Sequence, residues 1–157
     1  MMGARFYGEI LSNYVQAGSQ SCSSSVLEQL AHSDVDRIRL RVAENPKTPI
    51  DVLELLSTDS NADVRVAVGT NPSTPAHMSY ALAFDVDPNV RLGLAEDLNT
   101  PIELLDKLME DENPYVSSRA TETKAIKLSG DKPLDFGCHR FFRWAAKGVE
   151  QPELRYA

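Results

Sequence analysis

Hydrophobic residues in this chain occur in short runs separated by polar turns, and the whole pattern repeats at a step of 26 residues. Two signals mark the step. The dipeptide Thr-Pro occurs at 48–49, 74–75 and 100–101, and Ile-Arg or Val-Arg occurs at 38–39, 64–65 and 90–91. A fixed period of roughly 20–50 residues is typical of arrays in which each unit buries its apolar face against its neighbours. The sequence therefore predicts a repeat protein.

Each unit has the pattern of two short helices. In the first, apolar residues at i, i+1 and i+4, such as Val52, Leu53 and Leu56, form one buried stripe. We expect a threonine N-cap with proline at the first helical position, where the missing N–H costs nothing; the threonines are Thr48, Thr74 and Thr100. The second helix is expected to begin at Asn61, Asp87 and Asn113 and to be apolar on most sides.

These signals predict an all-α chain, a solenoid of about four 26-residue two-helix repeats in one domain spanning 1–157. The repeats occupy 23–126, with units at 23–48, 49–74, 75–100 and 101–126. Residues 1–22 are expected to form an N-terminal cap with a helix from Phe6 to Val15, and residues 127–157 a helical C-terminal cap. Such segments cover the open ends of a repeat core.

Two stretches carry a family resemblance. ENPKTPIDVLELLSTDSNADVRVAVGTNPSTP and DVDPNVRLGLAEDLNTPIELLDKL resemble the leucine-rich repeat variant family of HEAT-like α-solenoids, over about residues 23–122. The resemblance implies a right-handed superhelix of alternating short helices. Some relatives carry a cysteine-rich iron–sulfur segment ahead of the repeats. Here only Cys22 lies in that region, so no cofactor is expected.

Charge narrows the choice of partners. The net charge is −7, but residues 1–121 contain nine Lys/Arg and eighteen Asp/Glu, whereas residues 122–157 contain seven and five. An acidic body disfavours non-specific binding to nucleic acids, which requires clustered cations. No apolar run approaches ~20 residues, so no membrane span is expected. The first residues do not resemble a signal peptide, which favours the cytoplasm. Cys22 and Cys138 are expected to be free thiols.

Arginines recur in phase with acidic residues. Arg39, Arg65 and Arg91 follow Asp34, Asp59 and Asp85, and Asp111 continues the acidic column. A basic stripe could bind anions. We favour a structural ladder, in which each guanidinium bonds carboxylates and helix ends between adjacent repeats.

One face of the second helices is a candidate partner-binding surface. If it is the concave side, small residues form its floor and larger polar residues flank them. The candidate residues are Arg41, Ala67, Thr70, Asn89, Gly93, Tyr115 and Arg119. Tyr and Arg are frequent interface anchors. The alternative is a solvated face whose small residues permit tight packing of the repeats.

The C-terminal segment CHRFFRWAAK interleaves aromatic and basic residues. We favour a capping helix with Phe141 and Trp144 buried, over base stacking or a membrane-surface contact. Cys138 and His139 resemble a nucleophile and base, but helical neighbours point ~100° apart and no third residue orients them. The chain contains neither a glycine loop for phosphate nor His/Cys residues at metal-binding spacing.

The sequence thus favours a non-enzymatic interaction scaffold that presents a concave surface to a partner protein or peptide. The first alternative is a nucleic-acid-binding HEAT-like protein that uses the arginine ladder and the basic C-terminal helix. An enzyme that uses Cys138 and His139 is less favoured.

Overall fold

The computed structural model describes residues 2–129, with side chains from residue 8 onward, and the regular secondary structure in this part of the chain is helical. Its nine helices are α1 (Met2–Ala17), α2 (Ser24–Ala31), α3 (Asp36–Ala43), α4 (Ile50–Ser57), α5 (Ala62–Thr70), α6 (Ala76–Leu82), α7 (Pro88–Glu96), α8 (Ile102–Leu108) and α9 (Pro114–Ser129). The all-α prediction is confirmed for this range. Of the expected C-terminal cap, residues 127–129 belong to α9 and the remainder lies outside the described residues.

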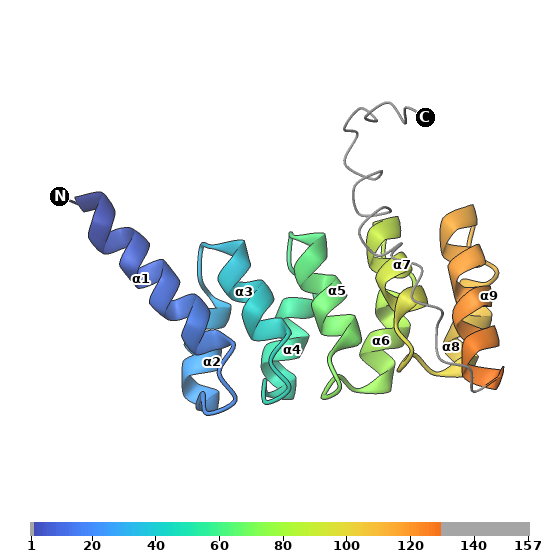
Figure 1. The fold of residues 1–157 in the computed structure, drawn as a ribbon, viewed down its shortest axis with the longest axis horizontal. Coiled ribbons are helices and arrows are strands. Elements are labelled where there is room, and N and C mark those ends of the chain that lie inside the picture. Colours follow the sequence, from blue (N-terminus) through green and yellow to red (C-terminus); the bar gives the residue numbers. More distant parts are fainter. Residues whose placement is uncertain (1, 130–157) are drawn as a thin grey trace, which may run out of the picture.

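The helices lie in two rows (Figure 1). α1, α3, α5, α7 and α9 pack against one another in succession, and each even-numbered helix packs against the two odd-numbered helices that flank it in the sequence. α1 begins at Met2, one turn earlier than the expected Phe6, and packs against α2 and α3. It therefore covers the side of α3 that would otherwise face solvent.

The core is one continuous cluster between the two rows. The even-numbered helices contribute leucines, among them Leu27, Leu53 and Leu105, which are fully buried. The odd-numbered helices contribute one branched residue at each 26-residue step, and these are Ile38, Val64, Val90 and Val116. Each such side chain contributes roughly 1.5–3 kcal/mol by leaving water. The apolar stripe predicted from the sequence is thus the inner face of the molecule.

The caps of the second helices are confirmed. The side chain of Asn61 accepts a bond from the Asp63 amide at 2.8 Å, and Asp87 accepts one from the Asn89 amide at 2.8 Å. Asn113 does the same for Tyr115 at 2.9 Å.

The prediction that threonines are the N-caps of the first helices is wrong. Pro49, Pro75 and Pro101 are themselves the N-caps, with extended backbone angles such as φ −60° and ψ 152° at Pro49. Each threonine hydroxyl instead donates backwards to the carbonyl six residues earlier, for example from Thr48 to Val42 at 2.6 Å. The threonine therefore joins the end of one helix to the start of the next.

Two buried asparagines connect consecutive units. The Asn71 amide donates to the carbonyls of Ala43 at 2.6 Å and Asn45 at 2.9 Å, and the Asn45 amide donates to Ala17 and Ser19 in the same way. Their side-chain oxygens accept the amide two residues on. In the sequence, asparagine before proline indicates only that a helix ends, so the pattern does not reveal this contact between units.

The third asparagine position is Asp97, and its replacement by asparagine is expected to stabilise the protein. The caps at Asn71 (φ −72°, ψ 130°) and Asp97 (φ −77°, ψ 119°) share one backbone conformation. Asp97 accepts the Asn99 amide at 2.9 Å, but an ionised carboxylate has no hydrogen to donate to the preceding unit. Asp97→Asn supplies two donors, and the free energy of unfolding should rise by about 1 kcal/mol. Urea unfolding at neutral pH measures this; an unchanged or lower value would contradict the assignment.

Candidate functional site

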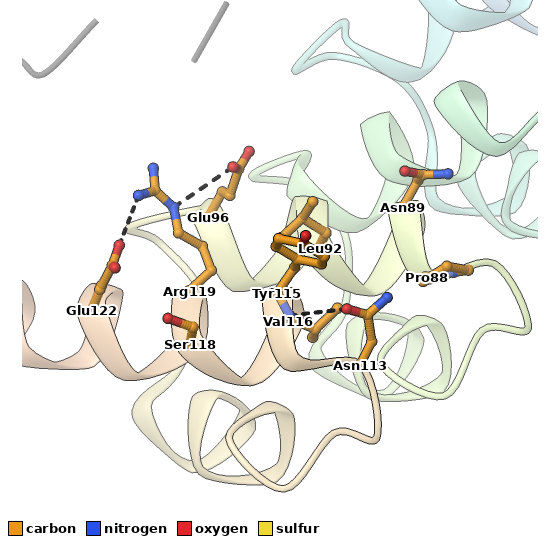
Figure 2. Close-up of a pocket in the computed structure, with 10 residues that line it drawn as sticks. All are labelled: Pro88, Asn89, Leu92, Glu96, Asn113, Tyr115, Val116, Ser118, Arg119 and Glu122. Atoms are coloured by element: carbon orange, nitrogen blue, oxygen red, sulfur yellow. Dashed lines mark hydrogen bonds and ion pairs between the residues drawn. The ribbon is translucent and has the colours of Figure 1, made fainter. Parts of the chain in front are cut away.

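A groove of about 360 Å³ lies between α7 and α9. Each helix begins with a side-chain cap followed by proline. The two caps fix where both helices begin, and these N-termini form one end of the groove. Figure 2 shows how side chains from the two helices converge on it. The lining residues are Pro88, Asn89, Leu92, Glu96, Asn113, Tyr115, Val116, Ser118, Arg119 and Glu122.

The middle of the groove is apolar. Val116 is fully buried, Leu92 is half-buried and packs against the core, and the Tyr115 ring is 64% exposed. In Figure 2 the side chains of Leu92 from α7 and Tyr115 from α9 overlap in the view, and both line the groove. A partner side chain placed here would exchange water for two apolar surfaces, which is favourable.

One end of the groove is ionic. Arg119 lies between two carboxylates, with its Nε 3.6 Å from Glu96 and its Nη1 donating to Glu122 at 2.9 Å (Figure 2). The three side chains carry one net negative charge. The opposite end offers the amides of Asn89 and Asn113, so a bound chain meets charge at one end and neutral hydrogen-bonding groups at the other.

The structure brings together three of the seven residues that the sequence proposed for partner binding. Asn89, Tyr115 and Arg119 line the groove. Thr70 is half-buried on α5, and its hydroxyl donates to Val66 within its own helix at 3.1 Å. Thr70 does not line the groove.

Arg41 belongs to a different part of the molecule. Its side chain covers Gly18 at the end of α1, and its guanidinium carbon lies 5.5 Å from the ring centre of Tyr14. Its Nη1 donates to Glu44 at 2.8 Å. Arg41 therefore packs on the end of α1 and does not line the groove between α7 and α9.

The interpretation of Ala67 and Gly93 as an exposed floor is wrong for Ala67, which is buried, and Gly93 is only half-exposed. Ala67 is 7% exposed, and a Cβ added to Gly93 would come within 2.6 Å of Cγ1 of Val66. These small residues allow α5 to pack closely against its neighbours. A glutamate at position 93 would consequently disturb the fold instead of altering binding alone. One 26-residue step after Gly93 the chain has a large residue, Arg119. The groove lies between α7 and α9, the helix that contains Arg119.

The remaining groove residues were missed as binding residues, although the sequence contains a signal for them. Leu92 lies in a helix that the sequence predicts to be apolar on most sides, and its column of the repeat also contains Leu40 and Val66. The next member of that column is Ser118, which leaves Leu92 without the apolar neighbour that the pattern predicts. A break in a repeated apolar column is therefore the signal for this groove.

The arginine ladder consists of three rungs. Each guanidinium donates two bonds to the aspartate of the following unit, as in Arg65 Nε to Asp85 at 2.7 Å and Nη2 to Asp85 at 2.9 Å. The third donor reaches the carbonyl of the residue six positions earlier, Asp59 for Arg65 at 2.7 Å. The other two rungs, Arg39–Asp59 and Arg91–Asp111, have the same geometry.

Two details of the expected ladder are wrong. The paired carboxylate comes from the unit that follows each arginine, and the arginine's own unit contributes only a carbonyl. Asp34 is outside the column, because Ser33 occupies that position and its carbonyl accepts from Arg39 at 2.8 Å. At the other end Ser117 stands where a fourth arginine would be. The ladder thus ends without an unpaired charge.

The ladder pairs displace the pKa values of their members. The hydrogen bond from Arg65 lowers the pKa of Asp85 against the opposing effect of burial, and the bond from Arg91 does the same for Asp111. At Asp59 burial alone would raise the pKa, but the bonds from Arg39 and the Asn61 amide outweigh it and the pKa is lowered. The three arginine pKa values are raised by the same bonds.

These shifts predict a loss of stability in acid. A carboxyl group whose folded pKa is below its ordinary value of 3.8 stabilises the fold above that value, and this contribution is lost as the pH falls through the folded pKa. Unfolding free energy should therefore decline steeply below pH ~4. Urea titrations from neutral to acidic pH measure the slope. Asp85→Asn should be less stable at neutral pH but shallower in acid; an equal slope would contradict the assignment.

The forks of Arg39, Arg65 and Arg91 are occupied by carboxylates and are not open to phosphate, which removes the ladder from the nucleic-acid alternative. The basic segment with Phe141 and Trp144, and the pair Cys138 and His139, lie outside the described residues. Between residues 2 and 129 no three His, Cys, Asp or Glu side chains are arranged to hold a metal ion. No helix in that range combines the length and apolarity that crossing a membrane requires.

Comparison of the chain with models of protein families, with curated proteins and with solved structures gives no match.

Proposed function

We propose that this chain is a short right-handed α-solenoid of four 26-residue, two-helix units, akin to the leucine-rich repeat variant family, and that it is a non-enzymatic protein-interaction scaffold. Its partner is a protein or peptide segment that binds in the groove between α7 and α9, in the cytoplasm. Recurrence of the same arginine, asparagine and threonine hydrogen bonds at the 26-residue step supports the repeat assignment.

The observation that carries the proposal is the composition of the groove. Its volume is at the lower end of the roughly 300–1,000 Å³ found for ligand sites, which suits one or two side chains of a peptide. Tyr115 and Arg119 are of the residue types that anchor interfaces, and they stand beside apolar Leu92 and Val116.

Two further observations favour binding over catalysis and a polypeptide over a nucleic acid. The displaced pKa values among the described residues fall on the ladder and on Arg41, and an ion pair accounts for each, as in structural networks. The excess of acidic residues over residues 1–121 repels polyanions.

Selection from a random peptide library tests the proposal. Peptides displayed on phage are selected against the immobilised full chain, and the enriched sequences are synthesised and titrated with the protein. Tyr115→Ala should weaken their binding by about tenfold, since loss of a central aromatic anchor costs more than roughly 1 kcal/mol. The thermal midpoint should stay near that of the parent, because the Tyr115 ring is largely exposed.

Ile50→Ala is the matched control, since Ile50 is an exposed apolar residue on α4 that does not line the groove. It should leave peptide affinity unchanged. Failure to enrich any peptide, equal affinity for Tyr115→Ala, or tight salt-sensitive binding to random duplex DNA would each count against the proposed function.

A further inference from the structure

The loop between α6 and α7 carries two large apolar side chains that the fold leaves in water. Phe84 is 73% exposed and Val86 is 93% exposed. The residues at the same positions of the other units are polar: His32 and Asp34, Thr58 and Ser60, Glu110 and Glu112. The apolar pair therefore belongs to this one loop and not to the repeat pattern.

Hydrogen bonds fix the backbone of the loop that carries these side chains. Asp85, which lies between them, is bonded by both Nε and Nη2 of Arg65 and accepts the Asp87 amide at 2.8 Å. The Phe84 amide donates to Ala81 at 3.1 Å, and Asp87 caps α7. Because the loop backbone is already ordered, it loses little conformational freedom when a partner binds to Phe84 and Val86, which favours affinity.

A second, more open depression of about 700 Å³ lies beside the pair, between this loop and the loop that joins α8 to α9. It adjoins the α7–α9 groove along the chain. Glu112 lines the depression, and its neighbour Asn113 lines the groove. In the same way, Val86 lines the depression and Pro88 lines the groove. A peptide that leaves the groove at the N-termini of α7 and α9 therefore reaches Phe84 and Val86.

The charges around the depression select the partner. Asp85 and Asp111 are neutralised by ladder arginines. Glu110 and Glu112 extend into solvent, and their contacts are loose, 4.0 Å to Lys107 and 3.8 Å to Arg91. The rim therefore carries net negative charge on an already acidic body. A second copy of the chain would bring a like-charged rim, and an anionic membrane would be repelled.

We propose that Phe84 and Val86 are a second docking point for the partner segment, and that this segment carries an apolar side chain flanked by lysine or arginine. The apolar side chain packs on Phe84 and Val86, and its cationic neighbours face Glu110 and Glu112. This inference rests on the proposed function, because it extends the path of a peptide bound between α7 and α9.

The double variant Phe84→Thr, Val86→Ser tests the docking point, since it installs the residues that the second unit has at Thr58 and Ser60. Both side chains are exposed, so the thermal midpoint should not change. Peptides enriched on the parent should bind the variant about tenfold more weakly. Thr58→Ala, Ser60→Ala is the matched control and should bind as the parent does.

A charge reversal tests the chemistry of the partner. On the parent, the library should enrich sequences with an apolar residue next to Lys or Arg, and their affinity should fall as salt rises. On Glu110→Lys, Glu112→Lys the same library should instead enrich acidic neighbours. An unchanged preference would overturn the assignment of charge.

The two proposals fail in different ways. Loss of binding in Tyr115→Ala with full binding in the Phe84, Val86 variant would overturn the docking point and leave the groove in place. Full binding in both variants would overturn both. Concentration-dependent dimerisation of the parent that the double variant abolishes, seen by sedimentation, would reassign the apolar pair to contacts between copies. Binding to vesicles of anionic lipid that depends on the pair would reassign it to a membrane.

Discussion

Arg65→Ala is expected to lower the free energy of unfolding by roughly 2–4 kcal/mol. The side chains of Arg65 and Asp85 are only 12% and 9% exposed, and three hydrogen bonds end on this guanidinium. Truncation removes the donors that Arg65 supplies to the Asp85 carboxylate and the Asp59 carbonyl, in a place that water reaches poorly. The cost is dominated by this uncompensated charge, since breaking one side of a buried pair is more destabilising than replacing both. Chemical unfolding measured by circular dichroism gives the value.

Two companion variants separate the ladder from a general effect of charge. Arg65→Lys should recover only part of the loss, because an ammonium lacks the planar fork that bonds both carboxylate oxygens and a carbonyl. Arg37→Ala removes an exposed arginine from the same kind of helix and should change stability by no more than about 0.5 kcal/mol. If Arg65→Ala unfolds like the parent but loses peptide binding, the structural role assigned to the ladder is wrong.

Asn71→Ala is expected to lower the free energy of unfolding by roughly 1–3 kcal/mol. The Asn71 side chain is buried, and its amide supplies donors to the carbonyls of Ala43 and Asn45, which belong to the preceding unit. Its oxygen also fixes the turn by accepting the Ser73 amide at 2.8 Å. Alanine removes all three bonds and leaves the carbonyls of the preceding unit with unmet hydrogen-bonding capacity at a buried position.

Asn89→Ala is the control for Asn71. Asn89 is exposed, and its side-chain amide donates to the neighbouring Asp87 cap at 2.9 Å. Its replacement should be nearly neutral for stability. Equal losses in the two variants would mean that Asn71 acts through its own helix end and not through the contact with the preceding unit. Together with Asp97→Asn, the series measures the same hydrogen bond by removal and by addition.

The sequence by itself determined the local structure. Helix boundaries follow from proline and from Asx caps, because each acts through the backbone of its own turn, and the caps at Asn61, Asp87 and Asn113 are where the pattern predicts. The buried stripes follow from apolar spacing, which depends only on helix geometry. Three groove residues, Asn89, Tyr115 and Arg119, were predicted from the helix face that they share.

Only the tertiary structure decided the contacts that cross between units. Thr48 could cap its own helix or bond the preceding one, and spacing along the chain does not distinguish these choices. Ala67 and Gly93 could be an exposed floor or a packing surface; the distance to Val66 decides for packing. The sequence also leaves open which carboxylate Arg65 bonds, because that choice depends on how far apart consecutive helices lie. The groove between α7 and α9 likewise depends on how these two helices pack, because a periodic pattern encodes the position of a side chain but not the space around it.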